Sequence, residues 1–101
     1  MPLSTTVGAV LCAAHRDRLG KLHGHTWTVW ARFPQDQSGL RDALVLQTKL
    51  RAIVDVWDHD ELPDDLASGE RLAEAIAILL GDADLVRLER LPEMIVAEWT
   101  A

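Results

Sequence analysis

The spacing of the apolar residues changes twice along this chain of 101 residues, and this limits the folds that it can adopt. Residues 5–15 are rich in small and β-branched apolar side chains and contain no Asp, Glu, Lys or Arg, which indicates a mostly buried strand. Residues 16–22 are polar and predict a loop. Residues 23–33 then alternate in character, which predicts a second strand with one face formed by His25, Trp27, Val29, Ala31 and Phe33.

Two helical patterns follow. The apolar residues after Leu44 fall on one stripe: Leu46, Leu50, Ile53, Val54 and Trp57. After a predicted loop over residues 60–67, Ser68 suits the N-cap of a helix that runs to Leu80, and Gly81 suits the position after its end. Two short strands, 85–89 and 94–99, are predicted to close the chain.

This order predicts a single α+β domain over residues 1–101, with the arrangement ββααββ. Its natural form is a four-stranded antiparallel sheet with both helices on one face. The other face would carry exposed apolar residues such as Trp27 or Trp30, and the edges of the sheet would be open. We therefore expect a homo-oligomer that forms through sheet edges or faces.

Charge and cysteine content limit the partners and the compartment. The formal net charge is −6, and the scattered Lys and Arg residues form no basic run, which argues against a nucleic-acid partner. A single cysteine, Cys12, cannot form an internal disulfide and favours a reduced, intracellular setting. The chain shows neither a signal-peptide pattern nor an apolar run of membrane-spanning length, so we expect a cytoplasmic protein without a membrane partner.

Three of the four histidines are placed to bind a metal ion. His23 and His25 are two residues apart on a predicted strand, so their side chains point to the same face. If the first two strands form a hairpin, His15 comes alongside them. Three imidazoles with a fourth position left to water are typical of catalytic zinc. A His-x-His pair alone could equally be polar surface, but the third histidine favours a zinc site.

Several motifs resemble one enzyme family. Ala13-Ala14-His15 followed by Leu22-His23-Gly24-His25 resembles the zinc-binding signature of the 6-pyruvoyl-tetrahydropterin synthases and the related bacterial 6-carboxytetrahydropterin synthases. The segment from Trp57 to Leu62 resembles that family's Leu-Asp-His-x-x-Leu motif, and Ser68 to Ala73 is similar to its Pro-Thr-x-Glu-x-Leu-Ala motif. Glu89 lies where the family places a substrate-binding glutamate.

The resemblance implies a T-fold that assembles into an oligomeric barrel, with active sites for a small-molecule substrate at subunit interfaces. It implies zinc on His15, His23 and His25, and a Cys–Asp–His triad of which Asp58 and His59 match two members. It also implies substrate contacts from Glu89, which would anchor a pterin ring, and from Ser68 in place of the family threonine. Without the resemblance, Glu89 would be interpreted as a surface carboxylate near a turn.

The chain departs from the family at the catalytic cysteine. The matching residue is Leu19, which has no acid or base capacity. Cys12 does not replace it, because it points to the face opposite His15 and by default fills a small apolar space. Asp17 or Lys21 from the same loop could transfer a proton, although the sequence alone places neither of them.

Three functions remain open at this stage. The first is a zinc-dependent lyase or synthase of this family that acts by proton transfer on a small polar, possibly non-pterin, substrate. The second is an ordinary 6-carboxytetrahydropterin synthase of the deazapurine pathway, against which Leu19 argues. The third is a non-catalytic relative that binds zinc or a small molecule, against which the pair Asp58 and His59 argues weakly.

Overall fold

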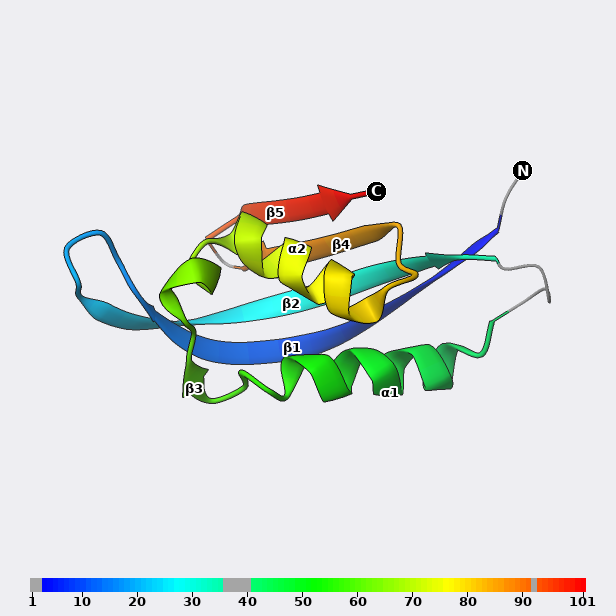
Figure 1. Ribbon diagram of the computed structural model, residues 1–101, viewed down its shortest axis with the longest axis horizontal. Helices are drawn as coiled ribbons and strands as arrows, with labels where there is room; N and C mark the ends of the chain where they lie inside the picture. The colour runs from blue at the N-terminus through cyan, green and yellow to red at the C-terminus, as the bar shows by residue number, and fades with distance from the viewer. Residues whose placement is uncertain (1–2, 36–40, 92) are drawn as a thin grey trace.

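A computed structural model describes residues 3–35, 41–91 and 93–101. In chain order its elements are β1 (Ser4–Arg16), β2 (Leu22–Pro34), α1 (Ala43–Val54), β3 (Asp60–Glu61), the 3-10 turn η1 (Asp64–Leu66), α2 (Gly69–Leu80), β4 (Leu85–Arg90) and β5 (Ile95–Thr100). The predicted α+β class and the order of the four long strands and two helices are confirmed (Figure 1). Neither described helix has the length and apolar character needed to cross a lipid bilayer.

The strands form one sheet in the order β3-β1-β2-β4-β5. The antiparallel hairpin of β1 and β2 pairs without interruption from Ser4↔Pro34 to Arg16↔Leu22. Strand β4 pairs with β2 only from Thr28 onward, so the hairpin extends beyond the rest of the sheet on that side (Figure 1). His15, His23 and His25 lie in this extended part of the hairpin.

Strand β3 is an addition to the predicted four-stranded sheet. It runs parallel to β1, and its two residues pair with Ala13 and Ala14. Residues 60–67 were expected to form a loop, because two residues are too few to show the alternation that marks a strand. The addition matters for the site, since it holds the segment before it against the edge of β1.

Both helices cover the same face of the sheet, α1 over β1 and α2 over β4 and β5 (Figure 1). The largest fully buried side chains of the resulting core are Leu11, Val29, Phe33, Leu50, Val54, Leu72, Ile76, Val86 and Leu88. Trp27 belongs to this core at 3% exposure, so the expectation that it lies on the open face is wrong. Its side chain points the same way as those of Val29 and Phe33, whereas Trp30, the other tryptophan expected on the open face, lies there at 37% exposure.

The ends of the helices follow the predicted capping residues. The Ser68 hydroxyl accepts a hydrogen bond from the backbone N–H of Arg71 at the start of α2, and Gly81 follows its end with φ +84°. Helix α1 ends at Val54, so Trp57 of the predicted stripe lies in the following turn, although it still packs against the core. Met94 has φ +61°, and β5 accordingly begins one residue later than predicted.

Candidate metal centre

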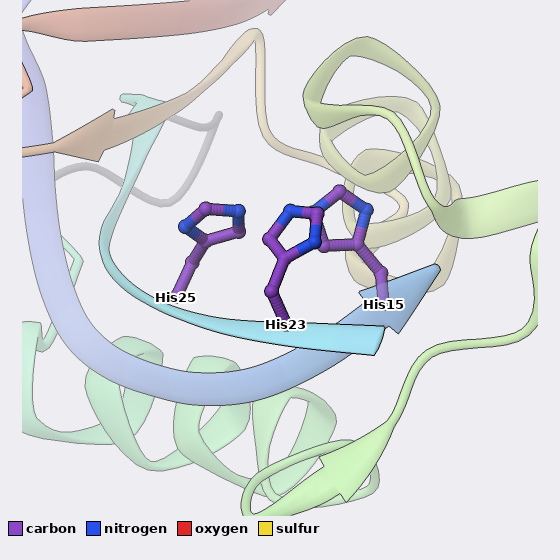
Figure 2. Close-up of side chains that lie close together, drawn as sticks. All are labelled: His15, His23 and His25. Carbon is purple, nitrogen blue, oxygen red and sulfur yellow. The ribbon is translucent and has the colours of Figure 1, made fainter. Parts of the chain in front are cut away.

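The hairpin of β1 and β2 brings the three predicted histidines together. His15 lies directly opposite His23, and His25 lies opposite Ala13. All three side chains extend the core-facing side of the strands beyond Trp27, and Figure 2 shows their rings on the same side of the hairpin. The ring centroids are 4.4 Å apart for His15 and His23, 4.6 Å for His23 and His25, and 4.9 Å for His15 and His25.

The ring nitrogens of this cluster fit a metal ion. One nitrogen from each ring lies within 4.8 Å of the other two, so a single ion could contact all three. Both nitrogens of His15 and Nε2 of His25 are buried without a hydrogen-bond partner among the described residues. Buried polar atoms rarely stay unpaired. Three imidazoles leave one position of a tetrahedral zinc ion open, as a catalytic zinc requires.

The surroundings keep two of the imidazoles neutral. Burial first, and then the nearby positive charge of Arg90, lower the pKa of His25 to about 4. Burial and the neighbouring His23 also lower the pKa of His15; the backbone of Ala67 opposes this shift without reaching hydrogen-bond geometry. A neutral imidazole is the form that binds metal, so the cluster is ready to bind at neutral pH.

The same pKa shift predicts how the metal-free protein responds to acid. Between its ordinary pKa of 6.5 and about 4, His25 binds a proton in the unfolded chain but not in the folded one. Protons therefore favour the unfolded state, and the free energy of unfolding should fall as the pH falls through this window. Urea denaturation of chelator-treated protein at about pH 7 and about pH 5 measures the change. A His25→Asn variant should lose less stability over this range, and an unchanged loss would contradict the assignment.

Asp58 and His59 lie at the outer edge of β1, away from the histidine cluster. Asp58 Oδ1 accepts the backbone N–H of Cys12 at 2.9 Å, and Asp58 Oδ2 lies 2.9 Å from His59 Nδ1. His59 has φ +60° and is 79% exposed, and its backbone N–H donates to the carbonyl of Cys12. No hydrogen bond or ion pair within the described parts of the chain joins this pair to the cluster.

Cys12 points to the open face of the sheet, as expected from its spacing to His15. It is half-buried rather than buried, and its Sγ lies 3.5 Å from Thr26 Oγ1. A cavity of about 700 Å³ on this side of the hairpin is lined by Cys12 and His59, and also by His25 of the cluster. The thiol therefore shares a cavity with His59, although it faces away from the three imidazoles.

The two predicted substrate-binding residues lie on different sides of the sheet. Ser68 lines a cavity of about 250 Å³ together with His15. Glu89 points to the open face, because it alternates with the core residue Leu88. There Glu89 Oε1 accepts the indole N–H of Trp30 at 2.6 Å, and Arg87 lies 3.6 Å from Oε2. Within one chain, Glu89 and the histidine cluster are thus separated by the sheet.

The loop that contains Leu19 uses the carboxylate of Asp17 to hold its turn, whereas the role of the Lys21 side chain in proton transfer stays a prediction. Leu19 is 92% exposed. Asp17 Oδ1 accepts the backbone N–H groups of Leu19 and Lys21 at 2.8 and 3.0 Å. These bonds, that from Lys21 first, hold the pKa of Asp17 below its ordinary value. Asp17 therefore acts as a turn-forming residue and is a poor proton acceptor.

One charged neighbour of the cluster was not predicted from the sequence. Arg90 ends β4 on the same face as Val86 and Leu88, and it lines the cavity that also contains His15 and Ser68. The sequence could have indicated its position, because the alternation of side chains from Val86 places Arg90 on the core-facing side of the strand.

Comparison with known proteins gives a fold. The sequence matches no protein-family model and no curated protein sequence. The structure is similar to the 6-pyruvoyl tetrahydropterin synthase of Caenorhabditis elegans, with a TM-score of 0.81 and 17% identity over 100% of this chain and 96% of that chain. For the enzyme of Plasmodium falciparum the TM-score is 0.73 with 14% identity, over 99% of each chain. For that of Plasmodium vivax it is 0.73 with 15% identity, over 100% of this chain and 99% of that chain. The T-fold predicted from the motifs is confirmed.

Proposed function

We propose that this chain, which has the fold of the 6-pyruvoyl tetrahydropterin synthases, is a zinc-dependent lyase or synthase that acts by proton transfer on a small polar substrate. The observation that carries the proposal is the cluster of His15, His23 and His25, whose ring nitrogens converge while three of them stay buried without a partner. Surface histidines would be solvated, and core histidines would be hydrogen-bonded. Metal binding accounts for both features.

The cluster would hold the zinc ion and leave one position for a substrate oxygen. When bound there, zinc supplies a Lewis acid that polarises a carbonyl or hydroxyl group and so acidifies the neighbouring C–H. Burial beside Trp27 excludes water from the inner side of the cluster. Neutral His15 and His25 need not lose a proton before binding the ion.

Asp58 and His59 are the proposed proton-transfer pair. The Asp58 carboxylate is held by the N–H of Cys12, which together with the hydrogen bond from His59 keeps its pKa below the ordinary value. It stays ionised and accepts the Nδ1–H of His59. This contact orients the ring and leaves Nε2 free to take or return a proton.

The positions of the two groups support an active site shared between copies of the chain. The cluster lies on the core-facing side of the hairpin, and His59 lies beyond the edge of β1 with most of its ring exposed. This arrangement favours groups that come from different copies of the chain, although His25 and His59 also line one cavity within a chain. The same holds for Glu89, which the sheet separates from the cluster. We therefore propose a homo-oligomer in which Glu89 and His59 approach a neighbour's cluster, while Ser68 serves its own.

The reaction of the ordinary 6-carboxytetrahydropterin synthases is the second candidate. The fold and the order of the motifs favour it, whereas Leu19 opposes it because its exposed side chain cannot transfer a proton. A non-catalytic zinc-binding protein is the third. The hydrogen-bonded pair of Asp58 and His59 argues against it, since zinc binding alone has no use for an oriented, exposed imidazole.

Incubation of the zinc-loaded protein with dihydroneopterin triphosphate tests these functions. We expect little carboxylated pterin from the wild-type protein, because loss of one proton-transfer group costs about 10²–10⁴-fold in rate. The variant Leu19→Cys tests whether the missing cysteine is the reason for the low yield. A gain of about 10²-fold or more would show that a pterin fits the site and that only the proton donor is missing. No gain supports a non-pterin substrate, and rapid turnover by the wild-type protein would establish the ordinary synthase reaction.

A further inference from the structure

Arg90 places a positive charge beside the histidine cluster. It is the last residue of β4, and alternation with Val86 and Leu88 directs it to the core-facing side, whereas Arg87 and Glu89 point to the open face. Arg90 and His15 line the same cavity, which places the guanidinium on the side of the sheet that carries the cluster. A metal ion on the cluster would add a second positive charge to the same small region.

The guanidinium of Arg90 is largely buried but has few hydrogen-bond acceptors among the described residues. Its Nε is buried without a hydrogen-bond partner among the described residues. One terminal nitrogen reaches Glu93 Oε1 only at 3.9 Å, which is too long for a hydrogen bond. The side chain is 23% exposed, so water reaches only part of it. A guanidinium offers five N–H donors, and a buried one is normally paired.

A cavity joins this cation to the cluster. It measures about 250 Å³ and lies between the start of α2 and strands β4 and β5, with Arg90, His15 and Ser68 in its lining. Glu70 also lines it, but forms no ion pair with Arg90 in the described part of the chain. The Ser68 hydroxyl already accepts the N–H of Arg71 and keeps its own O–H to donate. An oxyanion in this space would meet donors from both sides.

We propose that Arg90 binds a carboxylate or phosphate group of the substrate next to the metal centre, and thereby restricts the substrate to anions. The inference rests on the proposed metal centre. Two neighbouring cations repel each other, and an anion between them removes the repulsion and is attracted by both. A guanidinium suits this task because it can donate two parallel hydrogen bonds to one carboxylate or phosphate. Arg90 is thus a specificity-determining residue, and Ser68 is a second donor to the same anion.

Cobalt-substituted protein tests the proposal without any turnover. Co²⁺ in place of zinc has visible absorption bands that respond to its surroundings. Inorganic phosphate is titrated in one arm and glycolate, a small carboxylate, in the other. In the wild-type protein at least one anion should change the bands saturably. In Arg90→Gln the midpoint of that titration should rise about tenfold or more, because a hydrogen bond to a charged group is lost. The arm with the lower midpoint identifies the class of anion.

Two further variants make the test specific. Arg32→Gln removes an arginine from the open face of β2, where its partner is Asp84, and its midpoint should stay within about twofold of the wild type. Arg90→Lys keeps the charge, guards against a folding defect, and should lie between the wild type and Arg90→Gln. Equal midpoints for the wild type and Arg90→Gln, or unchanged bands with every anion, would overturn the proposal.

A wild-type protein that binds no Co²⁺ contradicts the metal centre instead. Arg90 is then tested in metal-free protein by the NMR resonance of its Nε–H. Phosphate or glycolate should shift this resonance saturably, and the absence of any shift would overturn the anion site as well.

Discussion

Replacing His25 with alanine should remove zinc from the protein together with the stabilisation that zinc provides. His25 is one of three imidazoles in the cluster, and two nitrogen ligands hold zinc far more weakly than three. Zinc at a hundredfold excess over its dissociation constant would stabilise the wild-type protein by about 2.7 kcal/mol, because it binds only the folded chain. In His25→Ala this gain should vanish. Metal analysis of purified protein and urea denaturation with and without zinc measure the two effects.

Without metal, the same substitution should change the stability of the protein very little. Nε2 of His25 has no hydrogen-bond partner in the described structure, so removing it breaks no hydrogen bond of this atom. In chelator-treated samples His25→Ala should therefore unfold at nearly the same urea concentration as the wild type. Thr26→Ala is the matched control, since Thr26 neighbours His25 but points to the open face, and its response to zinc should match that of the wild type. A large loss of stability without metal, and no zinc in the wild type, would make His25 a structural residue.

Much of the fold could be predicted because its elements are periodic. The alternation across residues 23–33 and the stripe from Leu46 to Val54 each bury one face, and the structure packs these faces against one another. Ser68 and Gly81 end up at the helix termini because their chemistry suits those positions. The features that could not be predicted are of two kinds. Some are too short to show a pattern, and others depend on which face of the sheet the helices cover. Strand β3 has two residues, and the alternation alone left open whether Trp27 or Trp30 would lie on the open face; the structure places Trp27 in the core.

The site could be predicted where it depends on spacing within one hairpin. His15 and His23 are paired across β1 and β2, and His25 follows on the same side, so a correct hairpin was sufficient to bring them together. The positions of His59 and Glu89 depend instead on tertiary arrangement. Motif order can match each residue to a role, but it does not say on which side of the sheet the residue lies. Only the structure shows that Glu89 lies on the face opposite the cluster and that His59 follows the outer edge of β1.

This separation leads to the second large effect, which concerns mixed oligomers. His23→Ala lacks a zinc ligand and His59→Ala lacks the proposed proton-transfer group, so each variant alone should lose about 10²–10⁴-fold of the turnover of any substrate that the zinc-loaded wild-type protein converts. Refolded together in equal amounts, they should recover activity at about a quarter of the sites, where an intact cluster from one copy meets an intact His59 from another.

A second mixture provides the control. His23→Ala and His25→Ala both damage the same cluster, so no combination of these two chains restores a complete set of ligands, and their mixture should stay inactive. Native mass spectrometry verifies that mixed oligomers have formed in both samples. If the mixture of His23→Ala and His59→Ala also stays inactive, the two groups do not meet between copies. The proposed active site shared between copies of the chain would then be wrong.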